Sequence, residues 1–557
     1  MSAEDFQSLR SSARKELLDA LTAHLPGKKV MYMDESLSSM VSLTLDVADL
    51  KNVGVDSWAK LDSPDVFRFE DQTCGVVFLV RSSNLFLFDF ISLHLSPSRL
   101  NLVLLVHPSS LSASLAMGTS IGSREGSREG GGCLAKEILQ DKPCEVVNIS
   151  KLFLTVLESD LCDLEISGIF RDFHIFGGTW KLSTLAAVLG NFPKFPIIHS
   201  IGHASQFVAE LLCKSYPSHQ CSSNCSSKHS SSIHSSSKHS SNSELILIDR
   251  SIDMLSIIAS QFSYESTIDE TLGIKGGYVR RKFLYDELFR EVRGRNFAQV
   301  SEFFKSKAES IQKVYREKEG LQEISDLHEY MEKFKVTQTA HTLLSWHVNL
   351  AKDISDQVSD RAALLEAEDG LMSGRLGGGA EEEIKKMMEK GETVDNVMKI
   401  GMMQGIVSGN FLGKQTIKDI LQNYGIEYMG LMENTEILIK NLAKNFWKIK
   451  DIFDLVPERE DALGEGYAGY VPLTVRLIER KERWREHTEA LNLLNGPVLE
   501  INTGRGEGEL VVCFVGGVTY GEINALRVLA QKQKKQISVI TTEILNCKSF
   551  FHSLAEF

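Results

Sequence analysis

Cysteine and histidine side chains recur in a serine-rich tract between residues 218 and 243. Spacings of four and five residues could bring such side chains around a zinc ion. The repeated SSKHS unit generates this spacing by itself, and the paired C-x-x-C knuckles of zinc sites are missing. A disordered, solvated insertion is therefore the favoured interpretation, with a metal site as the alternative. The ligands of that site would be Cys221, Cys225, His229, His234 and His239.

A second candidate site is the run LVVCFVGGVTYGEINALRVL at 510–529, which predicts a strand, a glycine turn and a helix. Backbone N–H groups in such a turn can hold phosphate. However, neither G-x-x-x-x-G-K-[ST] nor G-x-G-x-x-G follows Gly516 and Gly517. Thr519 and Glu522 instead have the spacing of a helix capping box. Capping is the favoured role, and a nucleotide site is the alternative.

A third candidate is LILIDRSID at 245–253, where Asp249 ends a predicted strand and Arg250 and Asp253 follow. Carboxylates at this position could hold magnesium or act as a phosphatase nucleophile. The D-x-D spacing of such enzymes is absent. We therefore expect Asp253 to cap the next helix or to pair with Arg250.

Other catalytic signatures are missing from the sequence. There is no G-x-S-x-G elbow and no H-E-x-x-H motif. The sequence therefore predicts a binding protein that is not an enzyme and has no cofactor or metal.

The elements that must position these residues follow two patterns. Short, continuously apolar runs indicate strands buried on both faces, as in parallel sheets covered by helices. Such runs occur at 29–34, 75–81, 101–106, 145–149, 245–249, 510–515 and 537–541. Helical patterns fall between them, as at 85–95 and 521–532. From about residue 281 to 450 the apolar residues recur at three and four, which indicates long amphipathic helices with a turn at Gly320.

Composition limits the classes of partner. The chain has 557 residues, and 61 basic against 74 acidic residues give a net charge of 61 − 74 = −13, so nucleic acid is not an expected partner. No run approaches the roughly 18 apolar residues of a membrane span. The start MSAEDFQSLR does not resemble a signal peptide. Nine cysteines in a chain of this length predict reduced thiols and a cytoplasmic protein.

Several runs resemble the Sec/Munc (SM) family, whose members bind SNARE proteins in vesicle fusion. The resemblance depends on three sequence runs: LILIDRSIDMLSIIASQFSYESTIDETLGIKGGYV at 245–279, YAGYVPLTVRLIER at 467–480 and VVCFVGGVTYGEINALRVLAQKQKKQISVITTEILNCKSFFHSL at 511–554. Within the family, YESTIDETLGI, LLEAEDGLMSG and the run Gly469, Tyr470, Pro472 resemble the branch that serves the HOPS and CORVET tethering complexes.

The resemblance implies an α/β plus α fold: a three-domain arch of two parallel-sheet α/β domains with a mainly helical domain inserted into the second. The first expected domain is 1–135. The second is discontinuous, comprises 136–250 and 490–557, and contains the insertion 218–243 in its first part. The third is the helical domain 251–489. In this fold Asp249, Arg250, Asp253, Gly516, Gly517, Thr519 and Glu522 form a structural motif.

The resemblance also implies partners. A SNARE is expected along a hairpin near 300–336, where the candidate contacts are Leu321, Ile324, Leu327 and Met331; packing inside the hairpin is their alternative role. A tether subunit resembling vacuolar protein sorting-associated protein 16, with other HOPS or CORVET subunits, is expected near Tyr467, Tyr470 and Arg476. The alternative for that segment is a buried turn.

The resulting hypothesis is a protein that templates SNARE assembly for fusion at endosomes, lysosomes or vacuoles. It would be cytoplasmic and recruited peripherally to late endosomal, lysosomal or vacuolar membranes through its partners, without direct membrane insertion. The alternatives are a tether subunit that binds no SNARE and a nucleotide- or magnesium-dependent α/β hydrolase.

Overall fold

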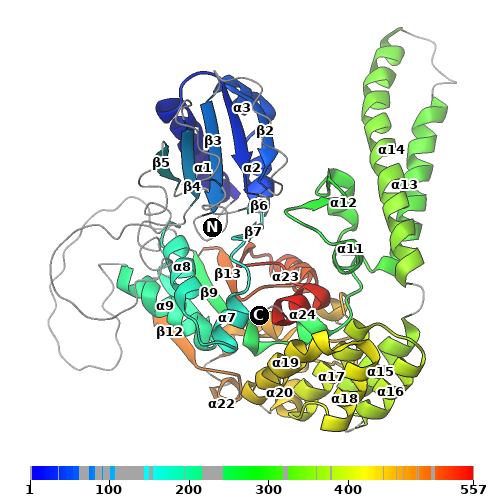
Figure 1. Ribbon diagram of the computed structural model, residues 1–557. Coiled ribbons are helices and arrows are strands. Elements are labelled where there is room, and N and C mark those ends of the chain that lie inside the picture. The colour runs from blue at the N-terminus through cyan, green and yellow to red at the C-terminus, as the bar shows by residue number, and fades with distance from the viewer. Residues whose placement is uncertain are drawn as a thin grey trace, which may run out of the picture. The chain divides into compact units, whose positions relative to one another are not determined.

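A computed structural model divides the chain into two compact units (Figure 1). Unit 1 comprises Met1–Asp249, Val498–Gly516 and Gln536–Glu543, and unit 2 comprises Arg250–Pro497, Gly517–Lys535 and Ile544–Phe557. The structure describes residues 3–34, 37–61, 75–81, 91, 101–106, 144–149, 155–192, 195–215, 243–317, 324–358, 361–376, 379–442, 445–459, 461–467, 469–484, 486, 488–502 and 508–555. In this part of the chain, no helix is both long and apolar enough to cross a membrane.

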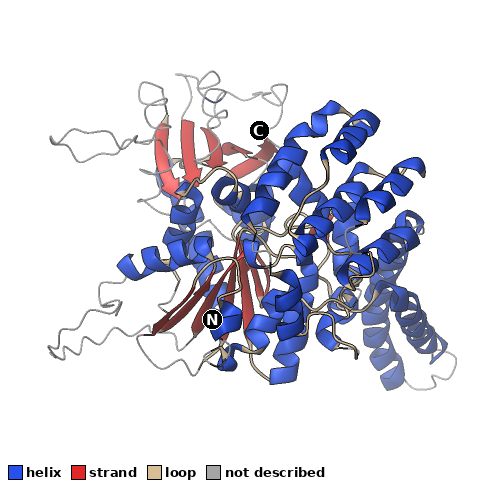
Figure 2. Ribbon diagram, turned by 90° about the horizontal axis from the view of Figure 1, so that it is seen from below, coloured by secondary structure: helices blue, strands red, loops and turns tan. Residues whose placement is uncertain are grey.

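Unit 1 contains two sheets, which Figure 2 shows as separate groups of strands. Among the described residues, the first sheet has the order β2-β1-β3-β4-β5 and every pair in it is parallel. Its strands are β1 (Lys29–Met33), β2 (Val55–Lys60), β3 (Gly75–Arg81), β4 (Asn101–Val106) and β5 (Glu145–Ile149). The helices α1 (Ala3–His24), α2 (Ser38–Thr44) and α3 (Val47–Asn52) contribute apolar side chains to its core.

The second sheet has the order β12-β8-β9-β13-β14-β7-β6 in the described chain. The strands from β8 to β7 in this order run parallel, and β12 and β6 pair antiparallel at the two edges. The bounds are β6 (Thr155–Glu158), β7 (Leu161–Asp163), β8 (Ile197–Ile201), β9 (Glu244–Asp249), β12 (Val498–Asn502), β13 (Leu510–Val515) and β14 (Ile537–Thr541). Helices α7 (Ile169–His174), α8 (Trp180–Leu189) and α9 (His203–Ser215) pack on this sheet through a shared apolar core.

Unit 2 is mainly helical (Figure 1). Its helices are η3 (Arg250–Ile252), α10 (Leu255–Ile258), α11 (Tyr264–Leu272), α12 (Glu287–Val292), α13 (Phe297–Glu317), α14 (Ile324–Val358), α15 (Ala362–Met372), α16 (Ala380–Glu389), α17 (Val394–Ser408), α18 (Lys414–Tyr424), η5 (Ile426–Tyr428), α19 (Met429–Asn441), α20 (Phe446–Phe453), η6 (Ala462–Gly464), α21 (Leu473–Glu479), η7 (Lys481–Arg483), α22 (Thr488–Leu491), α23 (Tyr520–Gln533) and α24 (Cys547–Ala555). A short hairpin of β10 (Tyr278–Val279) and β11 (Lys282–Phe283) accompanies them.

The predicted fold class is confirmed, because two largely parallel sheets and a helical segment between chain sections of the second sheet are present. Each strand that continuous apolarity predicted is found, six of them in a fully or mostly buried sheet interior. The strands β2, β6, β7, β8 and β12 were not predicted. All five lie at or next to a sheet edge, and β2, β6 and β12 are edge strands, in which one side is not enclosed and the apolar run is interrupted.

Two expected domain boundaries differ from the structure. The strand β5 belongs to the first sheet although it follows residue 135, because its backbone pairs with β4. The helices α23 and α24 belong to unit 2 although both fall within 490–557. Several predicted features lie outside the residues that the structure describes. They are Gly320, the 122–132 loop, residues 85–90 and 92–95, and nearly all of the Ser/His tract.

Candidate functional site

Asp249 ends β9 in unit 1, and its side chain is fully buried. One carboxylate oxygen accepts the backbone N–H of Ala204 at 2.8 Å, at the start of α9. The other lies 2.8 Å from Nε2 of His174. Gly202 has φ +99°, and a Cβ at that position would lie 2.4 Å from Cβ of Asp249. The carboxylate is thus enclosed by the protein and caps a helix, which leaves it no open position for magnesium or for a substrate.

Arg250, the next residue, takes part in a buried ion pair inside unit 2. Its Nη1 donates to Oε2 of Glu522 at 2.7 Å, and both side chains are fully buried. Arg250 also donates to the carbonyl oxygens of Asp253 and Gly517. Burial by itself lowers the pKa of Arg250, but the carboxylates of Glu522 and Asp253 outweigh it and raise that pKa overall. This buried ion pair joins η3 to α23.

The glycine turn before α23 is a capping structure, as predicted. Oγ1 of Thr519 accepts the backbone N–H of Glu522 at 3.2 Å, and Oε2 of Glu522 accepts that of Thr519 at 3.1 Å. Gly516 and Gly517 have φ +95° and +107°, which explains the two glycines. Since the Glu522 carboxylate already fills the amino end of the helix, this end has no place for a phosphate.

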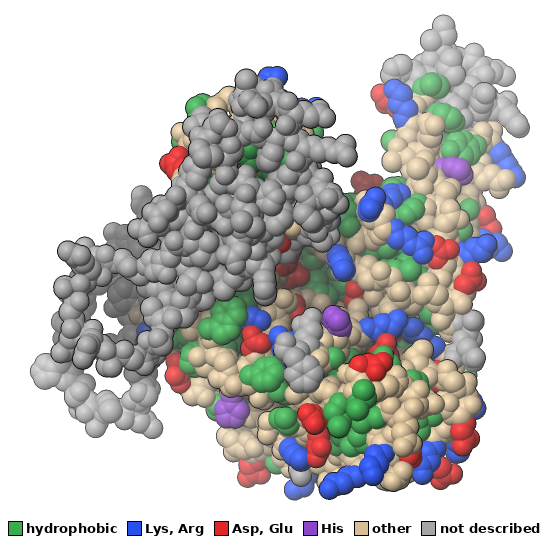
Figure 3. All heavy atoms as spheres, viewed as in Figure 1, with side chains coloured by type: hydrophobic (Ala, Val, Ile, Leu, Met, Phe, Trp, Pro, Cys, Tyr) green, Lys and Arg blue, Asp and Glu red, His purple; other side chains and the backbone are tan. Residues whose placement is uncertain are grey.

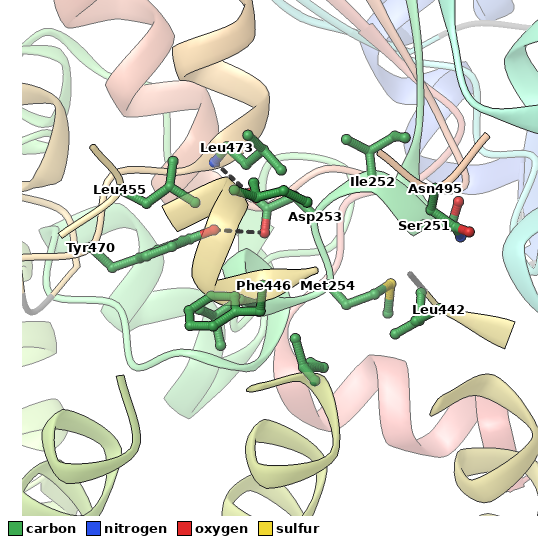
Figure 4. A pocket seen from close by; sticks show the side chains of 13 residues that line it. Ser251, Ile252, Asp253, Met254, Leu442, Phe446, Leu455, Tyr470, Leu473 and Asn495 are labelled. Carbon is green, nitrogen blue, oxygen red and sulfur yellow. Dashed lines mark hydrogen bonds between the residues drawn. The ribbon is translucent and has the colours of Figure 1, made fainter. Parts of the chain in front are cut away.

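Asp253 links two distant parts of unit 2 (Figure 4). Its Oδ1 accepts a hydrogen bond from Oη of Tyr470 at 2.9 Å, and its Oδ2 accepts the backbone N–H of Leu473 at 2.7 Å. The same carboxylate accepts both the N–H and the hydroxyl of Ser256 at 3.0 and 2.5 Å. Asp253 therefore caps the α10 segment, as predicted, and also fixes the start of α21.

Figure 4 also shows a small pocket beside this contact. It has a volume of ≈ 60 Å³, and Met254, Phe446 and Leu455 are among the apolar side chains that line it. This is room for little more than one or two waters or a small apolar group. A nucleotide does not fit. In the described chain no group of three or more His, Cys, Asp or Glu side chains could hold a metal ion.

The segment predicted to bind a tether subunit is buried. Tyr467, Tyr470 and Arg476 are only 2%, 1% and 4% exposed. Arg476 forms ion pairs at 2.7 Å with Asp461 and with Glu479, and Tyr467 Oη lies 2.7 Å from Oγ1 of Thr519. These side chains fill the interior of unit 2 and cannot contact a partner directly. The alternative interpretation of this segment as a buried turn fits these side chains. The prediction that they contact a tether subunit directly is not supported by their burial.

The predicted helical hairpin corresponds to α13 and α14. Figure 1 shows the two helices side by side, and their ring contacts include Tyr315 with Phe334 at 5.6 Å. On α14 the least exposed positions, from Phe334 through Leu344 and His347 to Ile354, recur at three and four and form the inner stripe. The remaining positions leave most of the described circumference of α14 open to solvent.

The structure describes the side chain of only one of the four predicted SNARE contacts on the hairpin. Met331 is 46% exposed on α14. Ile324 and Leu327 lie on the same helix, but their side chains are outside the described part, and so is all of Leu321. Val336 and Val348 are 72% and 44% exposed on that helix and were not predicted. At about 100° per residue, Met331, Val336 and Val348 point in three different directions, so the described surface has no continuous apolar stripe.

A buried aromatic cluster that the sequence did not predict holds the base of the hairpin. His347 of α14 is fully buried and stacks on Phe289 with an interplanar angle of 7°. Its Nδ1 lies 3.1 Å from Oη of Tyr264, and its Nε2 lies 3.1 Å from Oδ2 of Asp286. The LSWHVNLA run at 344–351 was the signal for this cluster, because a histidine on the apolar face of a helix needs polar partners.

Comparison with known proteins extends these findings. The Sec1 family model matches residues 29–553. The vacuolar protein-sorting-associated protein 33 homolog of Arabidopsis thaliana is 25% identical over 614 residues, which cover 99% of this chain and 98% of the relative. Vacuolar protein sorting-associated protein 33A of Rattus norvegicus is 26% identical over 624 residues, with 98% and 97% covered.

Two solved structures share the fold. The SM protein Vps45 in complex with the Qa SNARE Tlg2 is similar with a TM-score of 0.61 and 14% identity, covering 100% of this chain and 98% of Vps45. The Unc18–syntaxin 1 complex from Monosiga brevicollis gives a TM-score of 0.59 at 12% identity, with 98% and 99% covered.

Proposed function

Because this chain belongs to the Sec1 family, the SM proteins of vesicle fusion, we propose that it binds SNARE helices and templates their assembly before membrane fusion. A template of this kind holds two helices in register, so that the entropic cost of nucleating a helical bundle is met before the remaining helices join. Two structural neighbours, the SM protein Vps45 in complex with the Qa SNARE Tlg2 and the Unc18–syntaxin 1 complex, support this proposal.

The observation that carries the proposal is the hairpin of α13 and α14 in a Sec1-family chain. Its inner stripe packs the two helices together, while Met331, Val336 and Val348 are exposed on different sides of α14 as isolated apolar side chains. The aromatic cluster around His347 holds the base of α14 in a defined orientation relative to α11 and α12. A rigid, mostly polar helix surface with isolated apolar anchors suits a helical partner.

Binding of purified SNARE motifs tests the proposal. The full chain should retain at least one motif in a pull-down, and Met331→Asp should weaken retention at least tenfold because it places a charge at an anchor position. Ile437→Asp is the matched control, since Ile437 is 41% exposed on α19 of the same unit. Failure of the wild-type chain to retain any motif would count for the alternative, a tether subunit that binds no SNARE.

We further propose that the chain works in a HOPS- or CORVET-like tethering complex at late endosomes, lysosomes or vacuoles. The relatives named vacuolar protein sorting-associated protein 33 support this assignment. The direct partner would be a subunit resembling vacuolar protein sorting-associated protein 16, and it would recruit the chain peripherally to the membrane.

The exposed corner between η5 and α19 is the better place for this partner than the buried tyrosines. Ile426 is 78% exposed and Met429 43% exposed, and the two lie three residues apart, so together they offer an apolar contact at this corner. Ile426→Asp should abolish co-purification with the tether subunit while the melting temperature stays unchanged. Val336→Asp, at a residue that is 72% exposed on α14, is the matched control. Equal loss in both variants would contradict this site.

A further inference from the structure

Two large aromatic side chains of unit 1 are exposed where the chain passes from α7 to α8, Phe176 in the turn and Trp180 as the first residue of α8. Phe176 is 60% exposed and Trp180 is 40% exposed. Large aromatic side chains normally bury most of their 150–250 Å². Neither residue belongs to the core that α7 and α8 share with the second sheet. Figure 3 shows hydrophobic side chains at the surface around the position of α7.

The turn that carries these side chains has a fixed backbone. The N–H of Gly177 donates to the carbonyl of Phe173 at 3.1 Å, and that of Gly178 donates to the carbonyl of Asp172 at 2.7 Å. Gly177 has φ +71°, and a Cβ at that position would meet nothing within 4 Å. The turn therefore closes the carboxyl end of α7 and projects into open space.

The charges beside the turn are paired. Nζ of Lys181 lies 5.3 Å from the ring centroid of Trp180. The same ammonium group contacts Oδ2 of Asp172 at 2.7 Å and donates to the carbonyl of Ser167 at 2.8 Å. Nη2 of Arg171 lies 3.6 Å from the other oxygen of Asp172, and the buried carboxyl of Glu543 interacts electrostatically with both cations. Both cations beside the turn therefore have carboxyl partners, and residues 176–180 at its tip carry no charged side chain.

We propose that this turn inserts Phe176 and Trp180 into the headgroup region of a membrane, as an interfacial contact that does not depend on anionic lipid. The small area favours a lipid surface over a protein partner. Two partly exposed rings offer about 200 Å² between them. A stable protein interface, or a dimer of this chain, needs on the order of 1,000 Å² or more. Aromatic rings at the level of the headgroups, by contrast, act individually.

The inference goes beyond the proposed function and departs from the expectation of no direct membrane insertion. That expectation depended on two criteria, the lack of a long apolar run and the net charge of −13. Neither criterion can detect a pair of exposed aromatic side chains. Shallow insertion of two side chains is weak on its own. It would act as the second of two membrane signals, after recruitment by a protein partner.

Flotation of the full chain with phosphatidylcholine vesicles tests the inference. We expect measurable binding by the wild-type chain, and a loss of at least about tenfold in the partition coefficient when Phe176→Ser and Trp180→Ser are combined. The matched control is Trp58→Ser, because Trp58 is 41% exposed on β2 of the same unit and lies outside this turn. Adding phosphatidylserine should not strengthen binding. Tryptophan quenching by brominated phosphatidylcholine should fall in the Trp180→Phe variant.

Three results would overturn the inference: no binding of the wild-type chain to neutral vesicles, equal loss in the Trp58 control, or binding that requires phosphatidylserine. The membrane inference would also be overturned if the wild-type chain dimerises and the double serine variant does not. That result would assign the turn to contact with a second copy of the chain. The melting temperature of each variant shows whether the fold is kept. SNARE pull-down in the absence of vesicles does not involve this turn, so failure of the proposed function is seen separately.

Discussion

Arg250 and Glu522 are 272 positions apart in the chain, and their side chains meet at 2.7 Å with no exposure to solvent. The contact joins the segment after β9 to the first turn of α23, and Thr474 adds a third segment by donating to the other oxygen of Glu522 at 2.6 Å. The residues first considered as a catalytic centre therefore hold unit 2 together.

Replacing Arg250 with Met should destabilise unit 2 strongly. The variant leaves the Glu522 carboxylate buried without its cation, which costs about 3–5 kcal/mol in comparable buried pairs. Urea unfolding followed by tryptophan fluorescence measures the change. Arg375→Ala is the control, because the pair of Arg375 with Asp369 is 62% and 55% exposed and should change stability by less than about 1 kcal/mol. Similar effects of the two variants would contradict the role assigned to Arg250.

Tyr470 should tolerate neither loss of its hydroxyl nor a new charge. Tyr470→Phe removes the donor to Asp253 and should cost about 1–3 kcal/mol, since the buried carboxylate loses a partner. Tyr470→Asp places a second carboxylate against Asp253 and should unfold this part of unit 2. Limited proteolysis of the two variants checks the difference. A folded, protease-resistant Tyr470→Asp protein would show that the side chain is not buried as described.

Gly521 should not accept a side chain. A Cβ at this position would lie 2.6 Å from Oε1 of Gln261 and 2.7 Å from Oη of Tyr467. Gly521→Ala should therefore lower the melting temperature although alanine is the better helix former, because packing outweighs helix propensity here. The double variant Gly521→Ala with Tyr467→Phe should not restore the loss, because Cζ of the ring would still lie 2.7 Å from the new Cβ and Gln261 is unchanged. A single variant that is as stable as the wild type would contradict the close packing.

Stability should depend on pH through Asp269 of α11. Burial is the main cause that raises the pKa of this carboxyl to about 6, although the N–H groups of Ile274 and Asn546 act in the opposite direction. The unfolded-state pKa is lower, so the folded protein binds the proton more tightly. Asp269 therefore adds stability as pH falls from about 7 towards 4, and this contribution is lost as pH rises through 6. In the Asp269→Asn variant, the change in the free energy of unfolding between pH 7 and pH 4 should be smaller by up to about 3 kcal/mol.

Urea unfolding at several pH values compares the two proteins, and only the difference in slope matters. Carboxylates far from Asp269 contribute equally to both and cancel, whereas Glu265 and Glu270 repel Asp269 and belong to the difference that the variant measures. If the wild-type and Asp269→Asn slopes coincide between pH 4 and 7, the carboxyl does not titrate near 6 in the folded state.

Continuous apolar runs were sufficient to predict β3, β4, β5, β13 and β14 with the bounds that the structure shows. Of these, β3, β4, β13 and β14 lie inside their sheets, so nearly every residue has the same apolar environment, whereas β5 is an edge strand with an exposed Glu145. The edge strands β12 and β6 were missed because a strand with an open side tolerates polar residues, and β7 was missed because it has only 3 residues. The capping box of Thr519 and Glu522 was predicted correctly because it depends on two residues three positions apart.

Residues brought together from distant segments were harder to predict. The sequence placed Tyr467, Tyr470 and Arg476 in one segment but could not say that each has a buried partner elsewhere in the chain. The same holds for His347, whose partners are at 264 and 286. The resemblance of the runs at 245–279, 467–480 and 511–554 to the SM family identified the family correctly, and the Sec1 family match over residues 29–553 confirms it.

The rate at which SNARE motifs assemble into a bundle is the most direct measurement of the proposed function. Four purified motifs, two of them labelled for fluorescence energy transfer, are mixed with and without the full chain. A template should increase the assembly rate at least tenfold, Met331→Asp should lower that increase, and Ile437→Asp should leave it unchanged. An assembly rate that is the same with and without the wild-type chain, for every set of vacuolar or endosomal motifs, would contradict the account.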